Sequence, residues 1–154
     1  MKNLFTKIVM VMTMTMLYGS PTCSQTVSFK VLNTEKSSSS NVTVELMVYG
    51  KSKKTIDNDA QCAALKTVLF EGCPNTPYAK ALMEDGEITS REKYPQYFDN
   101  LYSIRYADFI SSCEAISAFK KGDKNKGTKY RVDVKVLNLR KDIEKNNIKR
   151  KVGL

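Results

Sequence analysis

The stretch VTVELMVY, residues 42–49, carries the clearest strand pattern of this chain. Its even-numbered positions are all apolar and branched, namely Val42, Val44, Leu46 and Val48. The intervening positions carry Thr43, Glu45, Met47 and Tyr49. Successive side chains of a β-strand point to opposite faces, so this alternation predicts a strand with one buried face and one wet face.

Further alternating segments lie on both sides of this strand. Residues 27–31 alternate in the same way, and the polar turn 36–41 makes the pair an antiparallel hairpin. Later in the chain, Ala115–Lys120 is predicted as a third strand and Tyr130–Val136 as a fourth. The lysine-rich loop 121–128 joins them into a second hairpin, which completes a mostly antiparallel sheet of about four strands.

A helix is predicted over Ala60–Glu71, where apolar residues cover a broad face. Gly72 and Pro74 end it, and Thr55 or Asp57 is expected to cap its start. A helix with so much apolar surface packs directly on the sheet. The expected fold class is therefore α+β: a two-layer sandwich of this sheet with two main helices on one face.

Residues 94–110 repeat aromatic and apolar side chains at helical spacing. The main members of this stripe are Tyr94, Tyr97, Phe98, Leu101 and Ile104. Core packing is the favoured interpretation, and a sugar-stacking platform is the alternative, because tyrosine suits amphipathic contacts. A short charged helix follows near the end, over residues 139–148.

The N-terminal 24 residues read as a secretory signal peptide. Two lysines precede the apolar run Ile8–Leu17, and mostly small residues follow it. Residues 25–154 then form one α+β domain with a basic C-terminal segment and no transmembrane segment in the mature chain. We expect export to the periplasm or cell surface of a bacterium. A lipid anchor at Cys23 is disfavoured, because Ser20-Pro21-Thr22 lacks the lipoprotein leucine.

The basic charge is concentrated near the C-terminus. Residues 25–119 hold 10 Lys/Arg against 12 Asp/Glu, whereas residues 120–154 hold 13 against 4. The residues proposed as an anion-binding patch are Lys120, Lys121, Lys124, Lys126, Lys129, Arg140, Lys141 and Lys145. Such a patch suits anionic lipid or polysaccharide, and a merely solvated surface is the alternative. Nucleic acid is a poor candidate partner for an exported protein.

Three cysteines fall within the domain, at positions 62, 73 and 113. Cys62 and Cys73 are ~16 Å apart along the predicted helix, too far for a disulfide. Cys113 can meet either of them, and the sequence does not choose between these pairings or between a disulfide and buried thiols.

Signatures of catalysis, metal binding and cofactor binding are missing from the sequence. Histidine is absent, which removes the commonest general base and zinc ligand. There is no phosphate-binding loop, no nucleophile elbow and no C-x-x-C pair. Asp57 and Asp59 could begin a calcium loop, but the later ligands are missing, so helix capping is preferred. We expect no cofactor, no metal and no catalytic residues.

The order of the elements resembles that of exported bacterial domains grouped around the LPP20 lipoproteins and the N-terminal region of the flagellar assembly protein FlgT. The matching parts are the strand Val42–Val48 with Gly50, the helix Ala60–Leu69, the strand Tyr130–Val136 and the closing stretch Leu139–Glu144. The resemblance implies a small α+β envelope domain that acts by contact.

Two classes of function follow from these observations. The favoured one is a non-catalytic envelope protein that binds another protein or assembles with copies of itself. The alternative is a carboxylate-dependent glycan-active enzyme or a glycan-binding module, with the tyrosine stripe lining a cleft. An enzyme of this kind needs two acidic side chains that converge within ~10 Å.

Overall fold

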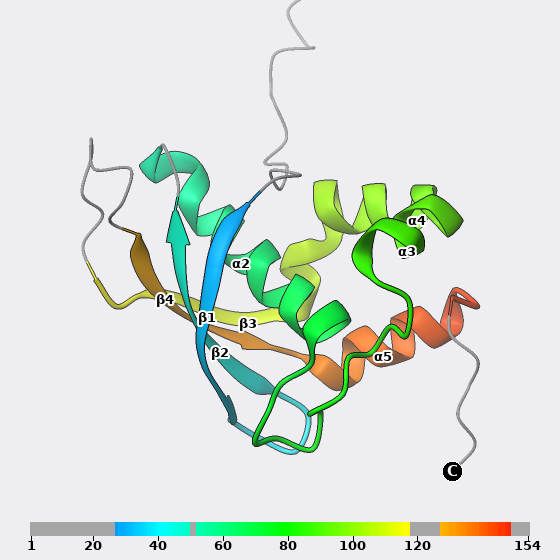
Figure 1. Cartoon of the computed structure of the whole chain (residues 1–154), viewed down its shortest axis with the longest axis horizontal. Helices are drawn as coiled ribbons and strands as arrows, with labels where there is room; N and C mark the ends of the chain where they lie inside the picture. The colour runs from blue at the N-terminus through cyan, green and yellow to red at the C-terminus, as the bar shows by residue number, and fades with distance from the viewer. Residues whose placement is uncertain (1–26, 50–51, 118–126, 149–154) are drawn as a thin grey trace, which may run out of the picture.

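The computed structural model describes residues 27–49, 52–117 and 127–148 of this 154-residue chain. The predicted signal peptide and residues 149–154 lie outside these ranges. Within them, a four-stranded antiparallel sheet carries its helices on one face (Figure 1). The predicted α+β fold with helices on one face of the sheet is confirmed.

The sheet has the strand order β1-β2-β4-β3, and every neighbouring pair is antiparallel. Its strands are β1 (Ser28–Lys36), β2 (Val42–Tyr49), β3 (Ile110–Ala115) and β4 (Thr128–Val134). Leu46 on β2 faces Val31 on one side and Tyr130 on the other. All four apolar residues of the 42–48 alternation are completely buried, which confirms the predicted strand and its buried face.

The long helix α2 (Lys53–Lys66) packs against β2 and β4 and continues into the π-helical turn η2 (Thr67–Glu71). Gly72 ends this helix as predicted, at a φ of +83° that favours glycine. A Cβ at Gly72 would lie 2.3 Å from the carbonyl oxygen of Ala79. The chain can therefore turn back closely here only because the residue is glycine.

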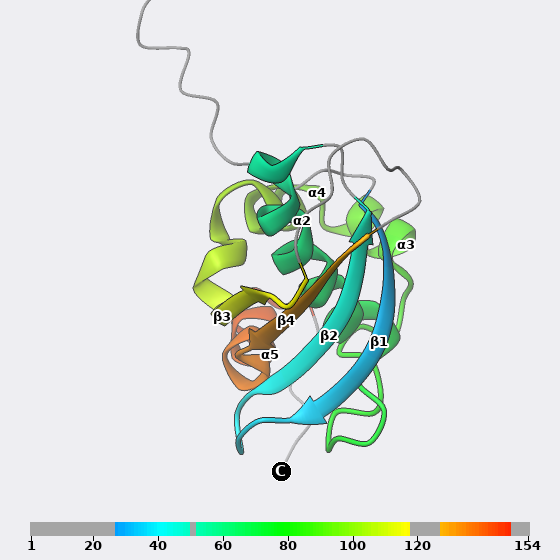
Figure 2. The ribbon, with the colours of Figure 1, turned by 90° about the vertical axis from the view of Figure 1, so that its left-hand side faces the viewer.

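Shorter helices complete the layer behind the sheet (Figure 2). They are α3 (Glu87–Lys93), α4 (Pro95–Asn100), the π-helical turn η3 (Leu101–Arg105), the 3₁₀ turn η4 (Tyr106–Phe109) and α5 (Val136–Lys145). Phe98 and Leu101 of the aromatic stripe are buried in the core as expected, whereas Ile104 is 70% exposed. Residues from both layers pack in one hydrophobic cluster.

Several local predictions are wrong in their bounds. The fourth strand is Thr128–Val134 rather than Tyr130–Val136, because Val136 begins α5, which is Val136–Lys145 rather than 139–148. The third strand is Ile110–Ala115 rather than Ala115–Lys120, and residues 118–120 lie outside the described ranges. The pairing of β3 with β4 shifts register between Ile110 and Ser112, so the sequence of β3 does not alternate regularly between apolar and polar residues. Helix α2 begins at Lys53, before both expected caps. Asp57 instead accepts a hydrogen bond from the hydroxyl of Tyr130 on β4, so its role is tertiary.

On the outer face of the sheet, where none of the described helices lies, polar side chains pair across the strands. Glu45 on β2 forms ion pairs with Lys129 at 2.9 Å and Arg131 at 2.7 Å on β4. Thr43 and Ser112 both donate hydrogen bonds to Asp133. The strand register itself places these partners opposite or next to one another.

Candidate functional site

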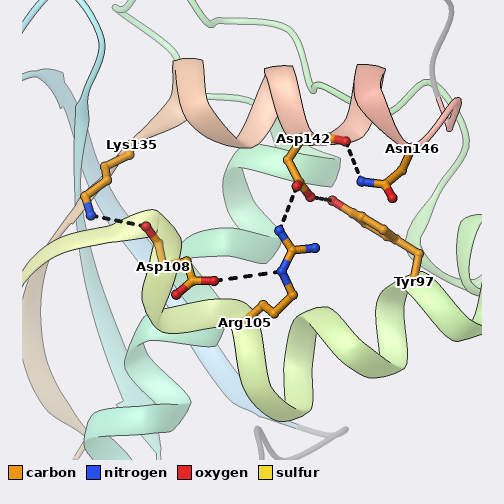
Figure 3. A network of polar contacts seen from close by, with 6 residues as sticks. All are labelled: Tyr97, Arg105, Asp108, Lys135, Asp142 and Asn146. Atoms are coloured by element: carbon orange, nitrogen blue, oxygen red, sulfur yellow. Dashed lines mark hydrogen bonds and ion pairs between the residues drawn. The ribbon is translucent and has the colours of Figure 1, made fainter.

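Asp142 on α5 joins this helix to the segment that contains α4 and η3 (Figure 3). Its carboxylate accepts hydrogen bonds from the Tyr97 hydroxyl at 2.9 Å and from Arg105 Nη2 at 2.6 Å. The apolar face of α5 is buried and includes Leu139 and Ile143, and Asp142 lies at the border of that face. The carboxylate therefore meets both partners in a partly buried setting, where charged hydrogen bonds are strongest.

Arg105 is held from several sides. Its Nε lies 3.8 Å from the carboxylate of Asp108, and its guanidinium carbon lies 5.5 Å from the ring centre of Phe109. Lys135 donates to the backbone oxygen of Asp108 at 3.1 Å, next to these groups. The guanidinium thus has a fixed position and orientation.

The network also shifts the pKa values of its members. The hydrogen bond from Arg105 to Asp142 raises the pKa of the guanidinium, which keeps it charged. Burial, and then the hydrogen bond to Asp142, raises the pKa of the Tyr97 hydroxyl. Tyr97 therefore remains a neutral hydrogen-bond donor at neutral pH.

An open groove of about 550 Å³ adjoins this network. Its volume falls within the ~300–1,000 Å³ typical of small-molecule sites. Two tyrosines, three amides and the fixed arginine contribute to its lining, namely Tyr94, Tyr97, Gln96, Asn100, Asn146 and Arg105. The residues come from α4, η3 and the end of α5, together with Tyr94 between α3 and α4. We call this feature the α4–α5 groove.

Among the described residues, the two cations that line the α4–α5 groove are paired with acids. Lys93 forms an ion pair with Asp85 at 2.5 Å, and this hydrogen bond raises the pKa of the lysine. Arg105 is paired with Asp142 and lies near Asp108. The described lining therefore offers fixed hydrogen-bonding groups and aromatic rings, and its cations are already paired.

A second hollow, of about 450 Å³, lies between the segment 77–82 and α5. Arg140 and Glu144 contribute to its lining, but they bind each other at 3.0 Å along the same helix. Its remaining lining comes from Tyr78, Leu82, Ile143 and neighbouring residues of the segment. This hollow lacks the fixed network that distinguishes the α4–α5 groove.

The predicted anion-binding patch is described only in part. Lys120, Lys121, Lys124 and Lys126 lie outside the described residues. Lys129 lies near the start of β4, whereas Arg140, Lys141 and Lys145 lie on α5, which follows the other end of that strand (Figure 1). The described residues thus do not bring Lys129 together with the α5 cations. The patch as a whole stays a prediction.

The cysteines do not form a reactive pair in the described residues. Cys62 is in a disulfide, and its partner is neither Cys73 nor Cys113, because both of these are free thiols. Burial raises the pKa of each free thiol to about 11. Thiols with such pKa values are largely protonated at neutral pH and are weak nucleophiles.

Within residues 27–49, 52–117 and 127–148, no group of three or more Cys, Asp or Glu side chains is arranged to hold a metal ion. In the same ranges, no helix combines the length and the apolar character that crossing a membrane requires.

Comparisons with known proteins give no relative to argue from. No protein-family model matches the chain, and the searches of curated proteins and of solved structures found no match. The resemblance to the LPP20 and FlgT-like envelope domains therefore stays a prediction, as do export and the bacterial envelope location.

Proposed function

We propose that this chain is an exported, non-catalytic bacterial envelope protein that acts by contact, and that the α4–α5 groove is its contact site. One observation carries the proposal: the Asp142 carboxylate fixes both Tyr97 and Arg105 on the wall of the groove. Groups that are held in place before binding lose little entropy when a ligand arrives. A surface built this way is suited to recognition.

Two expectations from the sequence support this assignment. The predicted signal peptide would carry the chain to the envelope, and the family resemblance implies a domain that works by contact. A protein partner or a second copy of the chain is one class of occupant, and a component of the envelope itself is another. The basic C-terminal segment remains proposed as a separate contact to anionic lipid or polysaccharide.

A second candidate function is a carboxylate-dependent glycan hydrolase. The observation in its favour is that Asp108 and Asp142 approach the same Arg105, at 3.8 Å and 2.6 Å. A hydrolase needs one carboxylic acid to donate a proton and a second carboxylate to act as base or nucleophile. Asp142 is committed to Tyr97 and Arg105, so binding is favoured over hydrolysis.

The test of the contact proposal compares two arginines that are paired in similar ways. Arg105→Gln alters the groove, whereas Arg131→Gln alters the outer face of the sheet, where Arg131 binds Glu45 at 2.7 Å. The exported chain and both variants are incubated with isolated envelopes of the native organism, and the bound fraction is measured.

We expect Arg105→Gln to reduce binding at least tenfold and Arg131→Gln to leave it unchanged. Asn100→Ala, on the exposed part of the groove, is expected to weaken binding without affecting the fold, which separates recognition from unfolding. Equal binding by all the folded variants would overturn the assignment of the groove. Release of reducing sugar from cell-wall glycan, lost in Asp108→Asn, would favour the hydrolase instead.

A further inference from the structure

The hydrogen-bonding groups of the α4–α5 groove are only partly used by the protein. Arg105 directs Nη2 to Asp142 and Nε to Asp108. Figure 3 shows its third nitrogen pointing away from both carboxylates, toward the side where Tyr97 and Asn146 lie. A guanidinium held by two acids can still donate hydrogen bonds from that nitrogen, in a direction that the protein has fixed.

The amides extend this surface. Asn146 donates from Nδ2 to the backbone oxygen of Asp142 at 2.8 Å, and its side-chain oxygen points away from that bond (Figure 3). Gln96 and Asn100 are exposed along the groove. An amide presents both a donor and an acceptor, so it pairs well with hydroxyl groups that act in both ways.

Two aromatic rings also line the groove, those of Tyr94 and Tyr97. Tyr94 and Tyr97 are half-buried, so each leaves part of its side chain accessible. Tyr97 packs edge-on against the buried Phe98, with ring centres 5.2 Å apart, which holds its ring in position. Rings that are fixed behind and accessible in front can pack against the apolar C–H face of a sugar.

Charge decides between classes of ligand. The network of Figure 3 contains two cations, Arg105 and Lys135, and two anions, Asp108 and Asp142. Lys93 is paired with Asp85. An anionic ligand would compete with the carboxylates that already bind Arg105 and Lys93, whereas a hydroxyl group accepts hydrogen bonds without displacing them.

We infer that the α4–α5 groove binds an uncharged, hydroxyl-rich oligosaccharide. Its ring face packs against Tyr94 and Tyr97, and its hydroxyl groups bind the amides and the outward nitrogen of Arg105. The inference rests on the proposed contact function and names the class of ligand for that site. It also uses the sugar-stacking alternative for the stripe, now restricted to the two tyrosines that line the groove.

The experiment titrates the exported chain with chitotetraose and cellohexaose as uncharged probes and with tetragalacturonate as an acidic probe. Binding is followed by calorimetry at low and moderate salt. Tyr94→Ala removes a ring from the groove, and Tyr49→Ala removes a ring from β2, outside the groove. We expect at least one uncharged probe to bind with an affinity that does not depend on salt. Tyr94→Ala should lower this affinity about tenfold, and Tyr49→Ala should leave it unchanged.

Each other outcome has a defined meaning. Salt-dependent binding of tetragalacturonate alone would overturn the uncharged class, and equal losses in Tyr94→Ala and Tyr49→Ala would overturn the site. If no sugar binds but Arg105→Gln still abolishes envelope binding, the saccharide inference fails and the contact function stands. If Arg105→Gln has no effect on envelopes either, both fail.

Discussion

The two faces of the sheet hold their acidic side chains by different means. On the outer face, the pairing of β2 with β4 places Glu45 opposite Arg131, so the backbone ladder positions the ion pair. On the helix side, no ladder connects α5 to η3, and Asp142 itself binds Arg105 and Tyr97. Glu45 lies on a sheet that main-chain hydrogen bonds already hold together. Asp142, in contrast, itself holds α5 against the segment that contains Tyr97 and Arg105.

This difference shows where a polar contact matters most for structure. A pair whose members are already aligned by main-chain hydrogen bonds adds little order, and solvent weakens it further. A partly buried carboxylate that joins two helical segments replaces the missing ladder and also shapes the adjacent groove. Paired substitutions on the two faces test this difference.

The largest expected effect on the free energy of unfolding comes from replacing a glycine on the helix side by alanine. At Gly72, on the helix side, a Cβ would overlap the backbone of residues 79–81, and the φ of +83° disfavours any L side chain. We expect Gly72→Ala to lower the free energy of unfolding by about 3 kcal/mol.

Gly127, next to β4, is the matched position. A Cβ there would meet the flexible side chain of Met47, with its Cγ at 2.5 Å, and that side chain can move. We expect Gly127→Ala to cost less than about 1 kcal/mol. Urea denaturation of both variants measures the difference, and equal losses would show that the outer face is as rigid as the helix side.

The next effect concerns Asp142. Asp142→Ala leaves the Tyr97 hydroxyl and one Arg105 nitrogen without their acceptor in a partly buried place. We expect the free energy of unfolding to fall by about 2 kcal/mol, as for the loss of a charged hydrogen-bond acceptor. Urea denaturation at pH 7 measures it, with Glu45→Gln as the comparison on the other face. A loss no greater than that of Glu45→Gln would contradict the structural role of Asp142.

These contrasts also explain what could be predicted from the sequence. The sheet was predictable because strand β2 alternates with period two and its buried face is filled by Val and Leu. The end of the long helix was predictable because Gly72 must adopt a positive φ. The alternation within β2 and the position of Gly72 are local patterns, so the sequence alone was sufficient for these two features.

The candidate site was not predictable in this way. Arg105 and Tyr97 are 37 and 45 residues from Asp142, and no period relates them. The stripe predicted a helical aromatic surface, and its members lie at Tyr94, on α4 and on η3, after the break at Tyr94 (φ −132°) that ends α3. Sequence spacing does not distinguish Tyr94 and Tyr97, which line the groove, from Phe98, which is buried.

A smaller effect on stability is expected from the buried hydroxyl of Tyr102. Tyr102 is 6% exposed, and its hydroxyl has no hydrogen-bond partner among the described residues. Lys66 Nζ and the Arg91 guanidinium each lie 5.6 Å from the centre of its ring, a contact that phenylalanine keeps. Tyr102→Phe is therefore expected to raise stability at pH 7 by up to about 1 kcal/mol.

The stability difference between Tyr102→Phe and the parent chain should grow as pH rises. Burial, and then the charge of Glu87, raises the pKa of Tyr102. Above about pH 10 the unfolded chain loses this proton and the folded chain keeps it, so rising pH costs stability at about 1.4 kcal/mol per pH unit. Thermal unfolding at pH 9 to 11 should show a shallower loss in Tyr102→Phe. Tyr130→Phe, which loses its bond to Asp57, should be destabilised at pH 7.

The smallest effect is expected on the outer face. Hydrogen bonds from Lys129 and then Arg131 lower the pKa of Glu45, so the folded state favours its charged form. This contribution is present above the ordinary glutamate pKa, about 4.3, and disappears as pH falls through the lowered value. Glu45→Gln should therefore be slightly less stable than the parent chain at pH 7 and equally stable near pH 2.

Because Arg131 and Lys129 reach solvent, about 0.5 M salt should remove most of the difference in stability between Glu45→Gln and the parent chain at pH 7. Urea denaturation at two salt concentrations measures this. If the loss in Glu45→Gln resisted salt while that in Asp142→Ala did not, the contrast between the two faces would be reversed.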